Sequence, residues 1–117
     1  MTDVSPRPVN DLEITPQDVA TMRADGRQSA FIDCRKPEEH ETARIEGSTL
    51  IPLADLDLHL PSLREHEDDL MVVYCHTGRR SLTMTTVLRD KGFSNVKSMA
   101  GGIERWSLEI DSSIPRY

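Results

Sequence analysis

One short run of the sequence combines a thiol, a glycine and two cations. The run reads Cys75, His76, Thr77, Gly78, Arg79 and Arg80. A cysteine attacks as its thiolate, and an ordinary thiol with a pKa of about 8.5 is mostly protonated at neutral pH. Successive backbone amides in a loop that contains glycine can curl into a concave anion-binding site. The run therefore predicts a nucleophilic cysteine in a loop that binds anions.

The two arginines separate this cysteine from an ordinary buried one. Taken alone, Cys75 could be a small hydrophobic residue that packs after a strand. We expect a helix to begin at Ser81, however, and positive side chains at a helix N-terminus are unfavourable unless an anion compensates them. Helix N-termini and arginines also lower the pKa of a nearby thiol. We therefore predict that Cys75 is rich in thiolate and that Arg79 and Arg80 orient an anionic substrate.

Other candidate residues give weaker signals. His76 and Thr77 either line the pocket or face water. Cys34 follows a segment expected to be a buried strand and has Asp33 beside it. This combination raises the pKa of a thiol, so a packing role is favoured. Asp33 and Arg35 form either a polar brace beneath the loop or an ordinary surface ion pair.

The remaining histidines and acidic residues have no spacing that indicates a site. The histidines without metal-ligand spacing are His40, His59 and His66. Three acidic residues, Glu38, Glu39 and Glu41, are interpreted as a solvated acidic face. No metal and no cofactor is expected.

Length and composition indicate one ordinary globular domain. The 117 residues are 37% hydrophobic and 29% charged, and the net charge of -6 argues against general binding of nucleic acid. The longest apolar stretch, residues 70–74, is far shorter than the roughly 20 residues that span a membrane. Residues 1–10 lack the pattern of a secretory signal, so a cytoplasmic location and two reduced cysteines are expected.

The elements that must position the loop alternate between strand and helix. Strands are expected at residues 30–33, 49–51, 70–74 and 95–99, and helices at 16–24, 37–43, within 53–66, at 81–91 and after 101–102. Residues 1–11 are expected to be a flexible arm and residues 12–117 the domain. The alternation predicts an α/β fold with a mostly parallel central sheet flanked by helices on both faces. Ligands of such sheets bind beyond the carboxyl ends of the strands, where residue 75 lies.

Three motifs resemble the rhodanese-like (sulfurtransferase) family, over nearly the whole chain from residue 12 to 106. Residues 31–40 are similar to the family's Asp-x-Arg-x-x-x-Glu signature, and the segment 45–53 that follows is also similar to the family. Residues 75–81 resemble the active loop, and residues 101–106 resemble the closing helix. The pair Ala43-Arg44 departs from the Gly-His that the family usually has before this second segment.

The resemblance implies a single rhodanese-like domain in which Cys75 carries sulfane sulfur as a persulfide. Its donor would be thiosulfate or another persulfide, and its acceptor cyanide or a thiol. The loop amides would hold the terminal sulfur, with Asp33, Arg35 and Ser81 as supporting residues. A sulfur-relay protein is a possible partner, whereas nucleic acid and membranes are not expected partners.

Two other classes share the same plan. A phosphatase or arsenate reductase also uses a cysteine and an arginine in one loop, but phosphatases of this type resemble the plan with one residue more than the four between Cys75 and Arg80. A rhodanese-like domain can also be a noncatalytic interaction module that has lost its cysteine. Cys75 argues against that class here.

Overall fold

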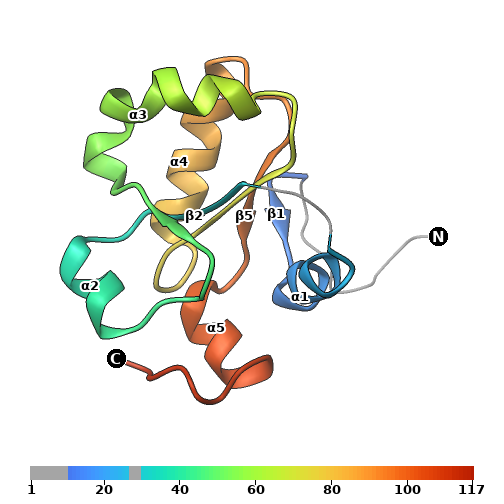
Figure 1. Ribbon diagram of the computed structural model, residues 1–117, viewed down its shortest axis with the longest axis vertical. Helices are drawn as coiled ribbons and strands as arrows, with labels where there is room; N and C mark the ends of the chain where they lie inside the picture. The colour runs from blue at the N-terminus through green and yellow to red at the C-terminus, as the bar shows by residue number, and fades with distance from the viewer. Residues whose placement is uncertain (1–10, 27–29) are drawn as a thin grey trace.

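The described part of the chain folds around a five-stranded sheet. The computed structural model describes residues 11–26 and 30–117 (Figure 1). Its strands are β1 (Glu13–Ile14), β2 (Ala30–Asp33), β3 (Thr49–Leu50), β4 (Met71–Tyr74) and β5 (Val96–Met99). They pair in the order β1-β5-β4-β2-β3, and every pair is parallel. The predicted α/β fold with a parallel sheet is therefore confirmed.

The helices occupy the segments between these strands. They are α1 (Pro16–Ala24), α2 (Pro37–Thr42), α3 (Leu56–Leu63), α4 (Arg79–Asp90) and α5 (Gly102–Glu109), and the 3-10 turns Leu53–Asp55 and Arg64–His66 flank α3. Several element ends differ by one residue from the sequence predictions, and two differences are larger. Helix α4 begins at Arg79 and not at Ser81, and the two-residue strand β1 was not predicted. The flexible arm expected over residues 1–11 lies, apart from Asp11, outside the described residues.

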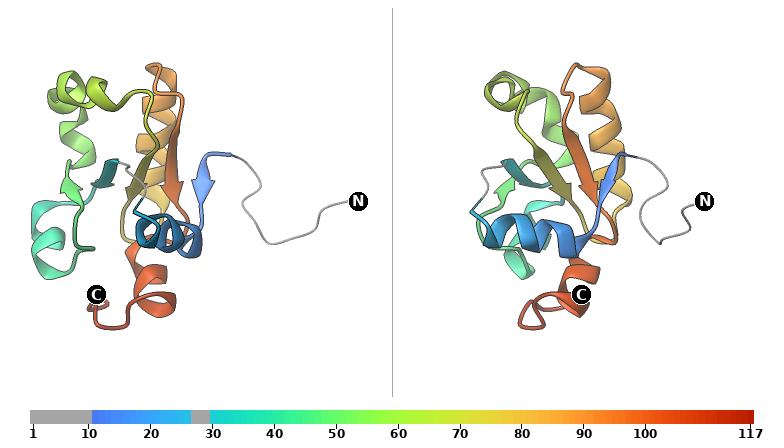
Figure 2. Two further views of the ribbon diagram at one scale, coloured as in Figure 1. Left: turned by 45° about the vertical axis from the view of Figure 1, so that its right-hand side comes forward. Right: turned by 90° about the vertical axis from the view of Figure 1, so that its right-hand side faces the viewer.

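Strand β4 is buried on both faces because helices cover each side of the sheet (Figure 2). Met71 and Val73 contribute to a core cluster shared with α3 and α4, whereas Val72 and Tyr74 contribute to a second cluster shared with α1 and α5. Successive residues of a strand point to opposite faces, so this division follows from the pleat. It explains why β4 is continuously apolar and confirms the prediction of helices on both faces.

The carboxyl ends of β2 and β4 bring distant parts of the chain together. Asp33 is the ladder partner of Tyr74, and the backbone N–H of Cys34 donates to the carbonyl of Tyr74 at 3.0 Å. Cys34 and Cys75 are therefore the next residues on two neighbouring strands. The same end of the sheet carries α2, the start of α4 and α5 (Figure 1).

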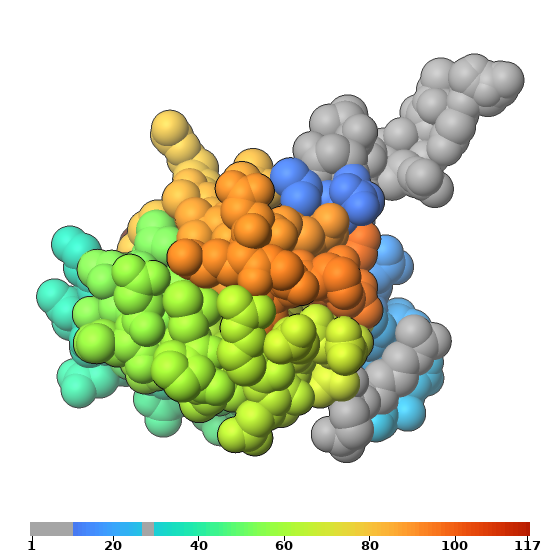
Figure 3. All heavy atoms as spheres, turned by 90° about the horizontal axis from the view of Figure 1, so that it is seen from above, coloured from blue at the N-terminus to red at the C-terminus, as the bar shows by residue number. Residues whose placement is uncertain are grey.

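Other segments cover the end of the molecule that lies opposite Cys75. Figure 3 shows this end from above, where the green segment around α3 and the orange segment at the end of α4 form the surface. Within the described residues, no helix is long and apolar enough to cross a membrane.

Candidate active site

The loop after β4 turns sharply into helix α4. Gly78 is the N-cap of this helix and has a φ of 106°, a left-handed conformation that favours glycine. A Cβ atom at Gly78 would lie 3.2 Å from the backbone nitrogen of Gly101, so the position is also tightly packed. The glycine therefore allows both the turn and its close approach to the start of α5.

The sulfur of Cys75 lies inside this turn and accepts hydrogen bonds from the backbone. The residue is 1% exposed, and its Sγ accepts from the N–H of Gly78 at 3.1 Å and of Ser81 at 3.3 Å. The Ser81 hydroxyl lies 3.4 Å from Sγ and 2.7 Å from the hydroxyl of Ser98 on β5. Two amides and one hydroxyl therefore surround the sulfur.

Helix α5 holds the loop in this orientation. The N–H of Ile103 donates to the carbonyl of Cys75 at 2.9 Å, and that of Glu104 donates to the carbonyl of His76 at 3.0 Å. A Cβ atom at Gly102 would come within 2.5 Å of the first of these carbonyls and 2.4 Å of the second, closer than real contacts allow. The loop carbonyls thus point toward α5, which leaves the amides of Gly78 and Ser81 to face the sulfur.

The environment of Cys75 favours its thiolate. A hydrogen bond with the Cys34 side chain, together with those from Ser81 and Gly78, lowers the pKa of Cys75 to about 5 against the opposing effect of burial. The sequence analysis expected a helix N-terminus and the arginines to lower this pKa. The amides of Gly78 and Ser81 belong to the start of α4, whereas the two arginines are not among the main causes.

Cys34 is buried against Cys75. Its hydrogen bond with Cys75, its burial and the nearby charges of Cys75 and Asp33 all raise the pKa of the Cys34 thiol, so it stays protonated. The sequence analysis predicted the direction of this shift from burial and the charge of Asp33; both contribute, but the effect of Cys75 was not predicted. Both cysteines are free thiols.

Arg80 is held in an ion pair on the edge of the site. Its guanidinium donates to both carboxylate oxygens of Glu39, at 2.7 and 3.0 Å. These bonds from Arg80, with one from the hydroxyl of Tyr117, lower the pKa of Glu39 to about 2. The prediction that Glu39 belongs to a solvated acidic face is therefore wrong. Arg79, in contrast, is exposed.

Asp33 and Arg35 form a buried brace and not a surface ion pair. Both side chains are 0% exposed, and two guanidinium nitrogens of Arg35 donate to the two oxygens of Asp33 at 2.8 and 2.7 Å. Burial opposes ionisation of Asp33, but the hydrogen bonds from Arg35 and His40 outweigh it and lower the pKa of Asp33. Arg35 also donates to the carbonyl of Ala43, which lies in extended backbone with a φ of -161°. An alanine is therefore accommodated there without strain.

The other two predicted loop residues lie at the rim. His76 is partly exposed, and its ring stacks on that of Tyr117 with centroids 4.1 Å apart, whereas Thr77 is exposed. The structure thus brings together Cys75, Gly78 and Ser81 around the sulfur, with Arg80 and His76 at the edge.

Sequence reasoning missed several residues of this site because their partners are distant in the chain. The missed contacts are made by Cys34, Glu39, His40, Ser98 and Tyr117. The match of residues 31–40 to the signature was the one signal that could have pointed to Glu39 as a partner of the loop.

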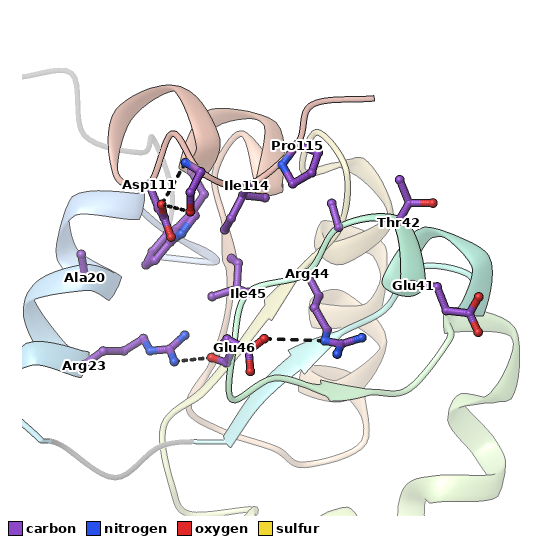
Figure 4. Close-up of a pocket in the computed structure, with 13 residues that line it drawn as sticks. Ala20, Arg23, Glu41, Thr42, Arg44, Ile45, Glu46, Asp111, Ile114 and Pro115 are labelled. Carbon is purple, nitrogen blue, oxygen red and sulfur yellow. Dashed lines mark hydrogen bonds and ion pairs between the residues drawn. The ribbon is translucent and has the colours of Figure 1, made fainter.

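A separate cavity of about 570 Å³ opens elsewhere on the surface (Figure 4). Arg23 and Arg44 extend along it toward Glu46, and Arg23 donates to the carbonyl of that residue. No residue of the loop 75–80 lines it. The cavity is therefore distinct from the candidate active site.

The fold and the site together define a parallel α/β domain that presents a cysteine thiolate in an amide-lined loop. Comparison with known proteins agrees: the family model "Rhodanese-like domain" matches residues 15–109. The chain therefore belongs to the rhodanese-like domain family, as its three motifs predicted.

The relatives of this chain include sulfurtransferases. It is 32% identical over 126 residues to "Adenylyltransferase and sulfurtransferase MOCS3-2" of Zea mays, and the alignment covers 100% of this chain and 26% of the relative. It is 36% identical over 100 residues to "Adenylyltransferase and sulfurtransferase UBA4" of Debaryomyces hansenii, covering 79% and 22%. The chain thus spans about a quarter of the length of these relatives.

A solved structure of similar size supports the fold. The human single-domain sulfurtransferase TSTD1 matches with a TM-score of 0.75 and 23% identity, covering 84% of this chain and 96% of that one. The likeness extends over nearly the whole of that single domain.

Proposed function

We propose that this protein is a sulfurtransferase that carries sulfane sulfur as a persulfide on Cys75. The observation that carries the proposal is the sulfur of Cys75, which is buried in the loop and stabilised as a thiolate by neutral donors. Thiosulfate or another persulfide would be the donor, and cyanide or a thiol the acceptor.

The reaction needs two displacements at sulfur. The Cys75 thiolate attacks the outer sulfur of thiosulfate, the bond to the sulfite sulfur breaks, and sulfite leaves with the electron pair. An acceptor thiolate or cyanide then attacks the outer sulfur of the persulfide and releases the Cys75 thiolate. Splitting the transfer in this way replaces one difficult step with two easier ones.

The residues around Cys75 have distinct roles in this proposal. The amides of Gly78 and Ser81 offset the charge of the reacting sulfur, as preorganised donors do in other active sites. Arg79 and the first amides of α4, which have no partner within the helix, would attract the anionic donor. Arg80 would act through its pair with Glu39, by fixing the edge of the site.

The phosphatase alternative fits this site less well. A phosphoryl group presents three equatorial oxygens that must all be bonded, and an arginine of the loop usually contributes to them. Here the Arg80 guanidinium already binds Glu39 through two bonds, and two of the loop amides are taken by the sulfur. A noncatalytic interaction module would have no need of an ionised cysteine.

The relatives support a place in sulfur relay. The names of the Zea mays and Debaryomyces hansenii proteins join an adenylyltransferase to a sulfurtransferase, and this chain aligns with about a quarter of each. We infer that a second protein delivers sulfur to Cys75 or takes it away. The two free cysteines suit a reducing compartment such as the cytoplasm.

An assay of one preparation with two substrates tests the proposal. We expect transfer of sulfur from thiosulfate to cyanide and no efficient hydrolysis of an aryl phosphate. Insertion of one glycine between Gly78 and Arg79 lengthens the loop and should reduce sulfur transfer, because the amides no longer converge on Cys75. Efficient phosphate hydrolysis by the unmodified protein, without sulfur transfer, would contradict this proposal and support the phosphatase alternative.

A further inference from the structure

Beyond α5, the C-terminal segment (residues 110–117) turns back toward α2 (Figure 1). Ile114 packs in the core cluster shared with α1 and α5, and the hydroxyl of Ser107 donates to its carbonyl at 2.7 Å. Arg116 pairs with Glu104 of α5. These contacts hold the segment on the fold independently of its last side chain.

The side chain of Tyr117 makes three contacts at the rim of the site. Its hydroxyl accepts a hydrogen bond from the Arg35 guanidinium and donates one to a carboxylate oxygen of Glu39, each at 2.7 Å. Its ring stacks on the ring of His76, with the centroids 4.1 Å apart and the planes inclined by 12°. A hydroxyl has one proton to donate and lone pairs that accept, so both hydrogen bonds form together. The tyrosine is therefore fixed by its ring and by its hydroxyl.

These contacts reach both ends of the active loop. His76 is the second residue of the loop 75–80. Arg80, its last residue, donates to both carboxylate oxygens of Glu39. Tyr117 therefore holds one end of the loop directly and the other end through Glu39.

The middle of the loop carries a donor to the reacting sulfur. The N–H of Gly78 donates to the sulfur of Cys75 at 3.1 Å, whereas Thr77 and Arg79 on either side of it are exposed. Exposed side chains add little packing that would hold this part of the backbone in place. A shift of either end of the loop would therefore move the Gly78 amide, which lies between them.

We propose that Tyr117 is a positioning residue of the site, which holds the two ends of the loop and so keeps its amides directed at the Cys75 sulfur. This inference rests on the proposed function, because those amides support the transfer of sulfur at Cys75. Preorganised donors stabilise a developing charge only if they are in place before the reaction, and a misplacement of about 1 Å can cost about 100-fold in rate. Tyr117 acts through His76 and Glu39, so it forms and breaks no bond in the transfer itself.

The Tyr117 hydroxyl and its acceptor stay in complementary protonation states. Burial raises the pKa of Tyr117 to about 12, so the hydroxyl keeps the proton that it donates. The hydrogen bonds from Arg80 and from Tyr117 lower the pKa of Glu39 to about 2, so its carboxylate remains an acceptor. The bond between these two residues is therefore present at neutral pH, where sulfur transfer is measured.

Two substitutions of Tyr117 and one control separate positioning from stability. Tyr117→Phe keeps the stacked ring and removes the bonds to Arg35 and Glu39, whereas Tyr117→Leu removes the ring and the hydroxyl. Leu63→Ala is the control. Leu63 is a buried residue at the end of α3 and lines a cavity with Ala30 at the start of β2, away from the loop.

Three measurements distinguish the outcomes. Hydrogen exchange of the peptide that contains residues 75–81 reports the opening of the loop and needs no sulfur donor. The kcat and KM for thiosulfate, with cyanide as acceptor, report the transfer. Thermal unfolding reports the stability of the domain.

In Tyr117→Leu we expect exchange of the loop peptide to be about tenfold faster and kcat about tenfold lower, with KM within about twofold, because a loosened loop loses transition-state stabilisation more than binding. Tyr117→Phe should change both quantities in the same direction by about threefold, because the stacked ring remains. Leu63→Ala should lower the melting temperature without a selective increase in exchange of the loop peptide and without a lower kcat.

Loop exchange and kcat that stay unchanged in both Tyr117 variants would overturn this role, as would losses no more selective than those in Leu63→Ala. Tyr117→Phe differs from the unmodified protein by one oxygen atom, so it decides the question if the larger change prevents folding. Unchanged exchange in a variant that still transfers sulfur would overturn the role of Tyr117 alone. Absence of transfer in the unmodified protein would instead contradict the proposed function.

Discussion

In the proposed reaction, the chemistry depends on one sulfur atom and the groups within bonding distance of it. The Cys75 sulfur contacts two backbone amides and the hydroxyl of Ser81, and no cation of the described residues is bonded to it. A thiolate held by neutral donors keeps its negative charge available for attack, whereas a tight ion pair would compete with the substrate for it. The same donors can follow the charge as it spreads over two sulfur atoms in a persulfide.

The two cysteines should respond differently to replacement by serine. Cys75→Ser should reduce sulfur transfer from thiosulfate to cyanide to the uncatalysed level, because a hydroxyl without a dedicated base is a far weaker nucleophile. Cys34→Ser should retain transfer, because the nucleophile and the amides that donate to it are unchanged. Steady-state rates of the two purified variants, with circular dichroism as the control for folding, check this pair. Activity that survives the first change and is lost in the second would exchange the roles of the two residues.

The pH dependence of alkylation in the unmodified protein tests the lowered pKa of Cys75. Because the thiolate is the reactive form, a pKa of about 5 predicts a rate that rises through pH 5 and is constant above about pH 6. Cys34, whose pKa is raised, should stay unreactive over the same range. Peptide mapping after timed exposure to iodoacetamide gives both rates. Equal rates with ordinary thiol titrations would contradict the electrostatic account.

At the scale of elements, the loop is shaped by the start of helix α5 as much as by its own sequence. The amides of Ile103 and Glu104 bond to the loop carbonyls, and Gly102 allows this approach because it has no Cβ. The sequence pattern could place a glycine pair at a helix start, but it could not show that the pair packs against residues 75–76. That contact depends on β5 lying next to β4 in the sheet.

Two glycine-to-alanine changes separate this packing from backbone strain. Gly102 and Gly26 have similar φ values, 62° and 75°, but a Cβ at Gly26 meets nothing within 4 Å. Gly26→Ala should therefore cost only the strain of a left-handed conformation, about 1 kcal/mol. Gly102→Ala should cost roughly 1–3 kcal/mol more, because a side chain must be forced into packed backbone, and should also reduce sulfur transfer.

Chemical denaturation and the transfer assay on the two glycine variants give both quantities. Equal losses of stability, with full activity in both, would show that α5 does not set the geometry of the loop.

At the scale of the whole molecule, the Asp33–Arg35 brace connects the sheet to segments far along the chain. Arg35 extends from the end of β2 to the carbonyl of Ala43 and, at 2.7 Å, to the hydroxyl of Tyr117. The ring of Tyr117 in turn covers His76 of the loop. The C-terminal residues are thus tied to the same site as the central strands.

The parts of the fold and of the site that the sequence predicted are those that depend on local sequence patterns. The alternation of strands and helices, the parallel sheet and the two-sided burial of residues 71–74 follow from local patterns and were predicted. The two-residue strand β1 was missed because such a short run has no periodicity. The pairing of Arg80 with Glu39 and of Cys34 with Cys75 depends on strand order, which no local pattern contains.

Breaking the buried brace should destabilise the whole domain. Asp33→Asn leaves the Arg35 guanidinium buried without its counter-charge, so we expect a loss of about 3–5 kcal/mol in the free energy of unfolding. Glu46→Gln disrupts an exposed pair with Arg44 and should cost less than about 1 kcal/mol. Denaturant titrations at neutral pH compare the two variants, and losses of similar size would contradict the importance of burial.

The same brace predicts an acid limit to stability. The pKa of Asp33 is lowered in the folded state, so its contribution is present above the unfolded pKa of about 3.9 and is lost as the pH falls through the folded value. Stability measured between pH 5 and 2 should therefore fall less steeply in Asp33→Asn than in the unmodified protein. Parallel curves for the two proteins would show that Asp33 does not contribute.

The mass of the intact protein after exposure to thiosulfate tests the central claim most directly. The account predicts that the protein gains one sulfur atom, that peptide mapping places this atom on Cys75, and that cyanide removes it. Cys75→Ser should gain no sulfur under the same conditions, whereas Cys34→Ser should gain one. A protein that folds normally but takes up no sulfur, or takes it up on Cys34, would contradict the persulfide on Cys75.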